Sequence, residues 1–194
     1  MKRFLPAIIA VLMFSMTFVA VVLGSRGFDP IVMSLGRVIL LVPAAVVTLR
    51  LQKLSLLPAR KDLGLIAIVA AGVIVAYPLL STYALASLSV GASGIINSLT
   101  PIIASVFALA IGHKQPKRAF WWAAAAGTVA TILFALSKDG HLTSTPLAVL
   151  ALFAGVVAAA VGNVSGATLS SRQKSYNVIS WAILLAAPVT LGAT

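Results

Sequence analysis

The sequence has no cysteine, no glutamate and only three aspartates among its 194 residues. Disulfides and thiolate chemistry are therefore excluded, and a metal site built from clustered ligands is not expected. Charged residues make up 9% of the chain, against about 25% in an average soluble domain. Hydrophobic residues reach 61%, which is more than a soluble core of this length needs. The composition therefore indicates a membrane protein, and no cofactor is expected.

The fourteen Lys and Arg residues alternate with long apolar segments. They gather in every second connection between these segments, whereas the other connections hold only Arg26 and Lys138. Cytoplasmic loops of membrane proteins retain Lys and Arg, and translocated loops are poor in them. The pattern therefore predicts a multi-pass protein of the inner or plasma membrane with its N-terminus in the cytoplasm. The basic connections hold Lys2 and Arg3; Arg50, Lys53, Arg60 and Lys61; Lys114, Lys117 and Arg118; and Arg172 and Lys174.

The net charge of +11 would also suit a nucleic-acid binder. Such a protein, however, gathers its Lys and Arg on one polar face. Here the charges separate segments of bilayer length, so no nucleic-acid partner is expected. A cleaved signal peptide is an alternative for residues 1–24, but its apolar region would be about 7–15 residues long and end at a small-residue cleavage site. Val22-Leu23-Gly24 is a poor site, which favours a membrane span.

Crossing the hydrocarbon core takes roughly 20 helical residues at about 1.5 Å each. The uncharged run 63–112 would be about 75 Å long as one helix, so it must hold two crossings, joined near Ser87–Gly91. The sequence thus predicts an all-α polytopic bundle of seven transmembrane helices. The expected spans are 4–23, 30–49, 64–86, 90–112, 119–137, 146–167 and a seventh that starts near Asn177.

A series of motifs follows a characteristic order along the third and fourth spans. They are Tyr83-Ala84-Leu85, Gly91-Ala92-Ser93-Gly94, Ser98-Leu99-Thr100-Pro101-Ile102 and Gly112. With Arg37 in the outer half of the second span, this order resembles the EamA-like family of drug/metabolite transporters, and the resemblance covers the whole chain. One position departs from the family. An acidic residue usually follows the glycine that closes the fourth helix, and here His113 follows Gly112, which puts any locking role of that residue in doubt.

The resemblance implies a ten-helix protein built from two inverted five-helix repeats. Residues 1–137 would then form the first repeat, and 138–194 the start of an incomplete second one. A weak internal similarity agrees, because Leu23-Gly24-Ser25-Arg26 and Leu169-Ser170-Ser171-Arg172 precede Pro43 and Pro188 by similar distances. Repeats with an odd number of helices have opposite orientations, as inverted repeats require.

The resemblance also implies the function, which is export or exchange of small metabolites such as amino acids through a central cavity between the repeats. The partners would be a small-molecule substrate and the lipid bilayer. The alternative is a truncated, non-transporting fragment or scaffold that packs with partner helices. Those helices would be the missing ones of the second half or further copies in a homo-oligomer.

Five polar residues in the spans are candidates for substrate binding: Arg37, Tyr77, Tyr83, Asn97 and Asn163. Arg37 is the strongest, because an Arg near a helix centre costs about 2.5–3.5 kcal/mol on insertion scales and normally faces a partner or a wet cavity. Arg37 would attract an anionic group, while Tyr77, Asn97 and Asn163 would supply hydrogen bonds.

Each candidate also has a structural interpretation. Arg37 could cap carbonyls of a neighbouring helix, Tyr83 could anchor the membrane interface, and Asn97 could join helices by a hydrogen bond worth about 1 kcal/mol. Pro101 removes the helical bond to the carbonyl of Asn97, and such a carbonyl can line a substrate path. Small residues at every fourth position predict close helix packing. These are Ala154, Ala158, Gly162 and Gly166, and Ala119, Ala123, Gly127 and Thr131.

Catalysis is not expected. Gly91-Ala92-Ser93-Gly94 matches the Gly-x-Ser-Gly of rhomboid intramembrane proteases, but that serine needs a histidine base inside another helix. His113 and His141 lie in expected loops on opposite sides of the membrane. We therefore predict that the chain is not an enzyme.

Because the chain has no native cysteine, its topology can be tested with single introduced thiols. We expect Lys53→Cys and Lys117→Cys to react with a membrane-impermeant maleimide only after the cells are opened. Labelling of either position in intact cells would contradict the predicted orientation.

Overall fold

The computed structural model describes residues 8–9, 12, 16, 23–24, 27, 30–113, 115–139 and 145–193. The predicted first span, 4–23, lies almost entirely outside these residues. Across the described part of the chain every regular element is a helix, which confirms the all-α class.

The helices follow the predicted spans closely. Two spans are interrupted: the third contains a π-helical segment between two α-helices, and the fourth is divided at Leu99. The turn between them, Ala86–Ser89, falls where the sequence predicts it. The elements are α2 (Pro30–Leu51), α3 (Arg60–Val69), η1 (Ala70–Ala76), α4 (Tyr77–Leu85), α5 (Val90–Ser98), α6 (Thr100–Ala110), α7 (Arg118–Asp139), α8 (Pro146–Ser170) and α9 (Ser175–Ala193).

Five helical segments among the described residues are long and apolar enough to cross a membrane. They are α2, the continuous segment α3–η1–α4, the pair α5–α6, α8 and α9. The apolar part of α7, Arg118–Phe134, is shorter than these. The number of seven spans, the division at residue 137 and the inverted repeats therefore stay predictions.

The local sequence explains where the fourth span begins and ends. Ser89 adopts an extended conformation and its hydroxyl oxygen accepts the Ala92 N–H at 3.2 Å, which caps α5. At the other end Gly112 has a φ of 84°, and the N–H of His113 donates to the carbonyl of Ala108 at 2.9 Å. This is the left-handed glycine termination that closes many helices, and it confirms Gly112 as the end of this span.

The π-helical segment η1 changes the direction of the side chains that follow it. The Tyr77 N–H donates to the carbonyl of Gly72, five residues earlier. Pro78 follows directly and has no N–H, so it cannot donate the backbone hydrogen bond that a helix would require at this position. The π-helical segment therefore ends beside a residue that itself interrupts helical bonding. One additional residue in a turn rotates the rest of the helix by about 100°, and this rotation sets the face on which Tyr77 lies.

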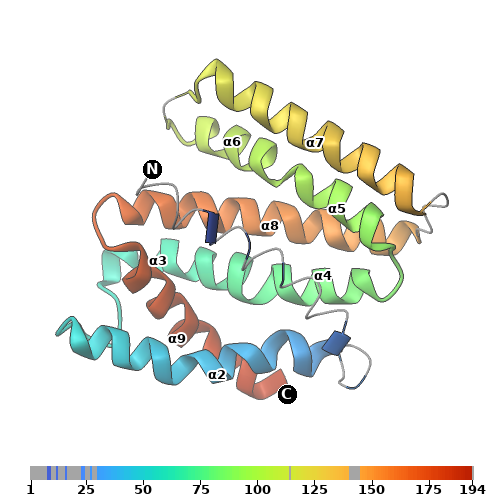
Figure 1. The fold of residues 1–194 in the computed structure, drawn as a ribbon. Coiled ribbons are helices and arrows are strands. Elements are labelled where there is room, and N and C mark those ends of the chain that lie inside the picture. The colour runs from blue at the N-terminus through green and yellow to red at the C-terminus, as the bar shows by residue number, and fades with distance from the viewer. Residues whose placement is uncertain are drawn as a thin grey trace.

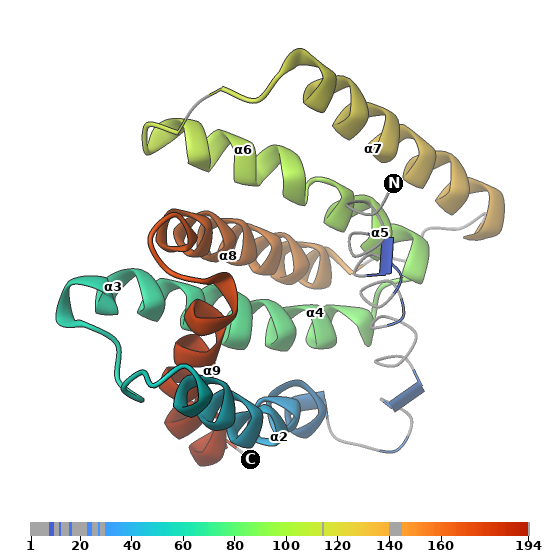
Figure 2. The same cartoon turned by 60° about the vertical axis from the view of Figure 1, so that its left-hand side comes forward.

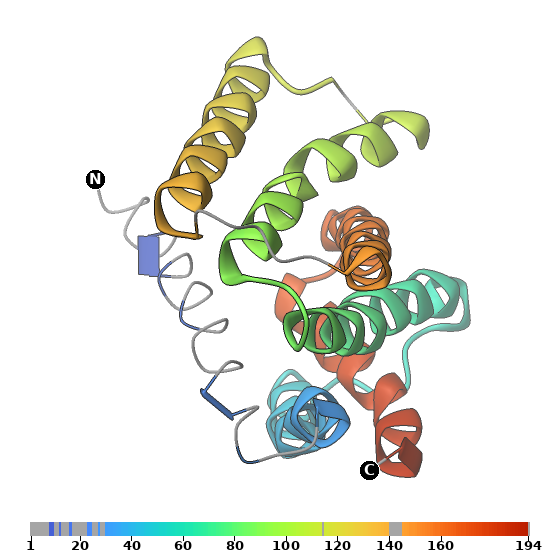
Figure 3. The ribbon, with the colours of Figure 1, turned by 90° about the vertical axis from the view of Figure 1, so that its right-hand side faces the viewer.

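The helices form a layered bundle around one central pair. Figure 1 shows the segment α3–η1–α4 beside α8, with α5, α6 and α7 on one side and α2 and α9 on the other. Seen from the end in Figure 3, the central pair is viewed along its axes, and α5–α6 lies between α8 and α7. In Figure 2 α9 runs obliquely from the end of α8 toward α2, across the direction of the other helices.

Three basic connections meet at one end of the bundle. The Lys174 Nζ donates to Gln52 Oε1 at 3.1 Å, and the indole N–H of Trp181 donates to the carbonyl of Ser55 at 3.0 Å. At the same end His113 Nε2 lies 3.0 Å from Thr168 Oγ1. The connections after α2, α6 and α8 therefore share one side, as the alternation of charge predicts.

The hydrogen bond of His113 gives this end of α6 a defined partner. Thr168 donates its hydroxyl proton to the carbonyl of Val164 at 2.9 Å, so its oxygen is free to accept from His113 Nε2–H. His113, at the position where the resemblance implies an acidic residue, thus joins α6 to α8.

Small residues bring the central pair into close contact. A Cβ added at Gly72 would clash with the carbonyl oxygen of Ala158, and one added at Gly162 would lie 2.7 Å from Val73 Cγ2. Such approaches are how helices associate in lipid. The predicted small-residue row on α8 is thus confirmed at Ala158, Gly162 and, against Val69, Gly166.

Two parts of the predicted rows are exposed in this structure. Ala154 is exposed, and Gly155 lies against Tyr77 and Leu80 instead. Gly155 precedes Gly162 by seven residues, which is about two helical turns, so both glycines lie on the same face of α8. On α7 the residues Ala119, Ala123 and Gly127 are exposed. In that row Thr131 packs against α5, because its Cγ2 lies 3.3 Å from the position that a Cβ on Gly94 would take.

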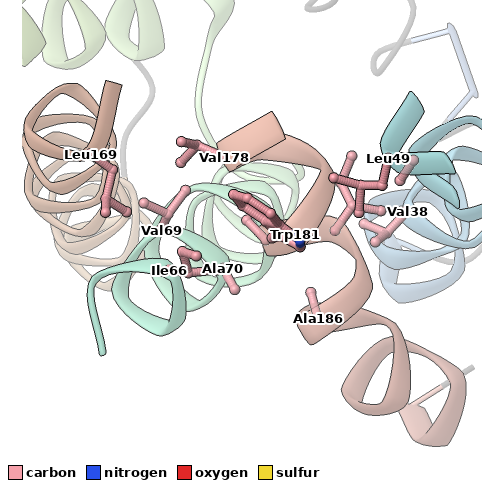
Figure 4. Close-up of a cluster of buried hydrophobic side chains, with 12 residues drawn as sticks. Val38, Leu49, Ile66, Val69, Ala70, Leu169, Val178, Trp181 and Ala186 are labelled. Carbon is pink, nitrogen blue, oxygen red and sulfur yellow. The ribbon is translucent and has the colours of Figure 1, made fainter. Parts of the chain in front are cut away.

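The larger core cluster joins α2, the third span, α8 and α9. Figure 4 shows Trp181 of α9 between Val38 and Leu49 of α2 and Ile66 and Ala70 of the third span. Leu49 and Ile66 are completely buried, and the indole of Trp181 is 5% exposed. Its N–H reaches the carbonyl of Ser55, so this large side chain is buried without an unpaired donor.

The contact at Gly72 can be tested by adding one methyl group. We expect Gly72→Ala to destabilise the protein by about 1–3 kcal/mol, because the clash is with rigid backbone. The matched control is Gly64→Ala on the same span, where no atom lies within 4 Å, and it should be neutral or mildly stabilising. Unfolding in detergent measures both, and equal stabilities of the two variants would contradict the close crossing.

Candidate functional site

A polar chain connects the third and fourth spans inside the bundle. The Tyr77 hydroxyl donates to Asn97 Oδ1 at 2.8 Å. The Asn97 amide Nδ2 donates in turn to the backbone carbonyl of Ser93 at 3.1 Å. Both groups of the amide are therefore engaged, and its orientation is fixed. The structure thus brings together two of the predicted site residues from different helices.

Arg37 on α2 is the third member of this cluster. Its side chain is partly buried, and its charge interacts electrostatically with Tyr77. Arg37 makes no ion pair with any described residue. Asp62 lies in the first turn of α3 and Asp139 is the last residue of α7, so both are at helix ends. We call Arg37, Tyr77 and Asn97 the polar cluster.

The three residues lie at the same depth. Arg37 and Asn97 each come seven residues after the start of their helices, at Pro30 and Val90. Tyr77 comes eight residues before Leu85, the end of α4. At about 1.5 Å per residue all three lie roughly 10–12 Å from the end opposite the basic connections. The polar cluster is therefore well inside the apolar length of these helices.

The break at Leu99 leaves few carbonyls free beside the cluster. Pro101 cannot donate to the carbonyl of Asn97, and the Thr100 hydroxyl does so instead at 2.7 Å. The carbonyl of Ser98 accepts the Thr128 hydroxyl of α7 at 3.4 Å. The two carbonyls therefore have partners within the protein, which supports the structural interpretation of Pro101 over a role in lining a substrate path.

The position of Tyr77 depends on residues that the sequence pattern did not single out. Gly155 of α8 lies against its ring, and a Cβ there would be 3.7 Å from Tyr77 Cδ2 and 3.2 Å from Leu80 Cβ. The π turn that begins after Val69 sets its rotation. Gly72 and Pro78 were the available sequence signals, since glycine permits close approach and proline interrupts helical bonding.

The other two predicted site residues lie elsewhere. Tyr83 is 52% exposed and comes two residues before the end of α4, which is typical of an interface anchor. Asn163 is exposed on α8 and comes seven residues before Ser170, so it lies roughly 10 Å from the end that carries the basic connections, in the opposite half of the bundle from the polar cluster. A role of either residue in binding stays a prediction.

The serine of the Gly-x-Ser-Gly motif has a structural partner. The Ser93 hydroxyl donates to the carbonyl of Ser89 at 3.0 Å. His113 lies at the opposite end of the same span, bonded to Thr168. Among the described residues, no group of three or more His, Asp or Glu side chains is placed to hold a metal ion.

These features define a multi-pass helical membrane protein with a polar cluster inside its spans. Residues 2–136 match the model of the EamA-like transporter family, and the chain belongs to this family. It is 33% identical over 186 residues to the uncharacterized transporter YdeK of Bacillus subtilis strain 168. That match covers 94% of this chain and 63% of the relative. No solved structure matches the chain at a significant level.

Membership of the family supports several coarser conclusions. The matched family is one of transporters, and the long apolar helices of the described residues agree with a protein that spans the membrane several times. The relative that the chain resembles is also named a transporter.

The Tyr77–Asn97 hydrogen bond can be measured by a double-mutant cycle. We expect the Tyr77→Phe and Asn97→Ala variants to show a coupling energy of about 0.6–1 kcal/mol, as interhelical hydrogen bonds in membranes do. The control cycle pairs Tyr83→Phe with Asn97→Ala, because Tyr83 is exposed and lies outside the cluster. Unfolding in detergent gives the free energies. A coupling energy near zero in the first cycle would contradict the bond.

Proposed function

We propose that the protein transports small metabolites that carry an anionic group, such as amino acids. The observation that carries the proposal is the polar cluster, in which three helices place a cation, a phenol and an amide at one depth. Arg37 would bind the anionic group of the substrate. Tyr77 and Asn97 would hold its polar atoms, once their mutual hydrogen bond opens to admit it.

The proposal that the substrate carries an anionic group follows from the unpaired positive charge of Arg37 among the described helices. An Arg within a span costs several kcal/mol unless its charge meets a partner or water. No described carboxylate lies at the depth of Arg37. A substrate carboxylate would supply the missing negative charge and could form two parallel hydrogen bonds with the guanidinium.

We further propose that the cluster lines a central cavity between two inverted repeats. Support comes from the packing of α2 against α9, which would be the second helices of the two repeats. Each contains an internal proline, Pro43 in α2 and Pro188 in α9. The chain spans 63% of the length of its relative YdeK, and the helices beyond that share would close the cavity.

The orientation in the membrane also belongs to this proposal. The end that carries the three basic connections would face the cytoplasm, in the plasma membrane, with the N-terminus on the same side. The polar cluster would then lie in the outer half of the bilayer, about 10–12 Å from the outer ends of its helices.

One observation favours the alternative of a scaffold that packs with partner helices. Asn163 is exposed at a level of α8 where lipid would surround it. An amide in hydrocarbon seeks a hydrogen-bond partner on another helix. A partner helix, from a second copy or from the rest of a longer chain, would supply one. Transport and scaffolding differ in one measurable respect, which is whether a substrate moves.

The test compares amino-acid efflux from cells that express the wild type, Arg37→Ala or Arg37→Lys. We expect Arg37→Ala to reduce efflux about tenfold or more, the range for losing a hydrogen bond to a charged group. Arg37→Lys should retain part of the activity, because it keeps the charge and loses the two-pronged geometry. The control is Arg50→Ala, an exposed charge at the end of the same helix.

Unchanged efflux in the Arg37→Ala variant would contradict a role of the polar cluster in transport. Absence of efflux in the wild type, with the protein present in the membrane, would favour the scaffold.

A further inference from the structure

The end of the bundle that carries the basic connections has a dense positive surface. All described Lys and Arg side chains of residues 50–61, 115–118 and 172–174 are exposed. The aspartate of this region, Asp62, is 5% exposed and offers little negative charge to the surface. We call these exposed side chains the basic end.

Two tryptophans fix the level of the basic end in the membrane. Trp121 and Trp122 follow Arg118 in the first turns of α7, and they are 36% and 78% exposed. Exposed Trp side chains of membrane proteins lie at the level of the lipid headgroups. The cations beside these tryptophans would therefore lie near the level of the phosphates.

Part of this surface is held in place. Lys174 donates to Gln52 Oε1 at 3.1 Å, and its ammonium lies 5.6 Å from the centre of the Tyr176 ring. These contacts join the connection after α8 to the connection after α2. The cations after α2 and those after α8 thus lie on one surface that requires the folded bundle.

We propose that the basic end binds the headgroups of anionic phospholipids. The argument is charge complementarity at a fixed depth, because an anionic leaflet attracts Lys and Arg near its surface by about 1 kcal/mol each. The lipid bound there would hold the three connections together. This binding is separate from transport and does not depend on the polar cluster.

The native tryptophans provide the measurement. The full chain is placed in phosphatidylcholine vesicles that contain a minor share of phosphatidylglycerol, with bromine on the acyl chains of either lipid at equal amounts. Bromine quenches nearby indoles, and Trp181 contributes a nearly constant background because it is buried. We expect stronger quenching with brominated phosphatidylglycerol, and salt should reduce the difference.

Two double variants test whether the basic end causes the preference for phosphatidylglycerol. Lys61→Gln with Lys117→Gln should lower the preference for phosphatidylglycerol, by about fivefold per lysine where screening is small. Arg26→Gln with Lys138→Gln removes the same charge from positions outside the basic end and should leave the preference unchanged. Equal quenching by both brominated lipids, or an equal loss in both variants, would overturn the proposal. Quenching does not require transport, so either result leaves the proposed function to its own test.

Discussion

In the hydrocarbon core of a bilayer no water is present to bond an exposed carbonyl or hydroxyl, so the protein must satisfy its own polar groups. The described spans show how this is done. Hydroxyl groups donate to carbonyls of their own helix, as Ser105 does to Pro101 and Thr131 to Gly127. Where Leu99 breaks a helix, Thr100 and Thr128 supply the missing donors. Irregular backbone is therefore tolerated at the positions where hydroxyls are available.

The same constraint separates the polar cluster from the rest of the spans. The amide of Asn97 is bonded at both ends, since its oxygen accepts from the Tyr77 hydroxyl and its nitrogen donates to the carbonyl of Ser93. Arg37 differs, because it carries a full charge away from the helix ends and no described residue forms an ion pair with it. Close contacts at Gly72 and Gly155 hold the third span against α8, and the π turn directs Tyr77 toward the fourth span. The third span and Tyr77 are thus held in place, and Arg37 adds a charge that no described residue pairs with.

Much of this arrangement could be predicted, because lipid imposes simple rules on a sequence. Span lengths and the alternation of Lys and Arg placed the helix ends within a few residues, and they gathered the basic connections at one end. Polar residues inside apolar segments identified Arg37, Tyr77 and Asn97. Position along a helix does not reveal which way a side chain faces, however. The sequence thus does not show that Asn163 is exposed, or that Gly155 and not Ala154 lies against Tyr77. The π turn is not predicted by the periodicity of the span, although Gly72 and Pro78 lie within it and just after it.

The most direct test of the central claim is the contact of position 37 with water. The native chain has no cysteine, so Arg37→Cys provides a single reactive thiol. A small, charged, membrane-impermeant thiosulfonate should modify it, and a substrate anion should slow the reaction. Leu40→Cys is the reference, because Leu40 is 80% exposed on the outer face of the same helix, where lipid would cover it. A thiol at position 37 that is as unreactive as the one at position 40 would contradict a water-filled path at the polar cluster.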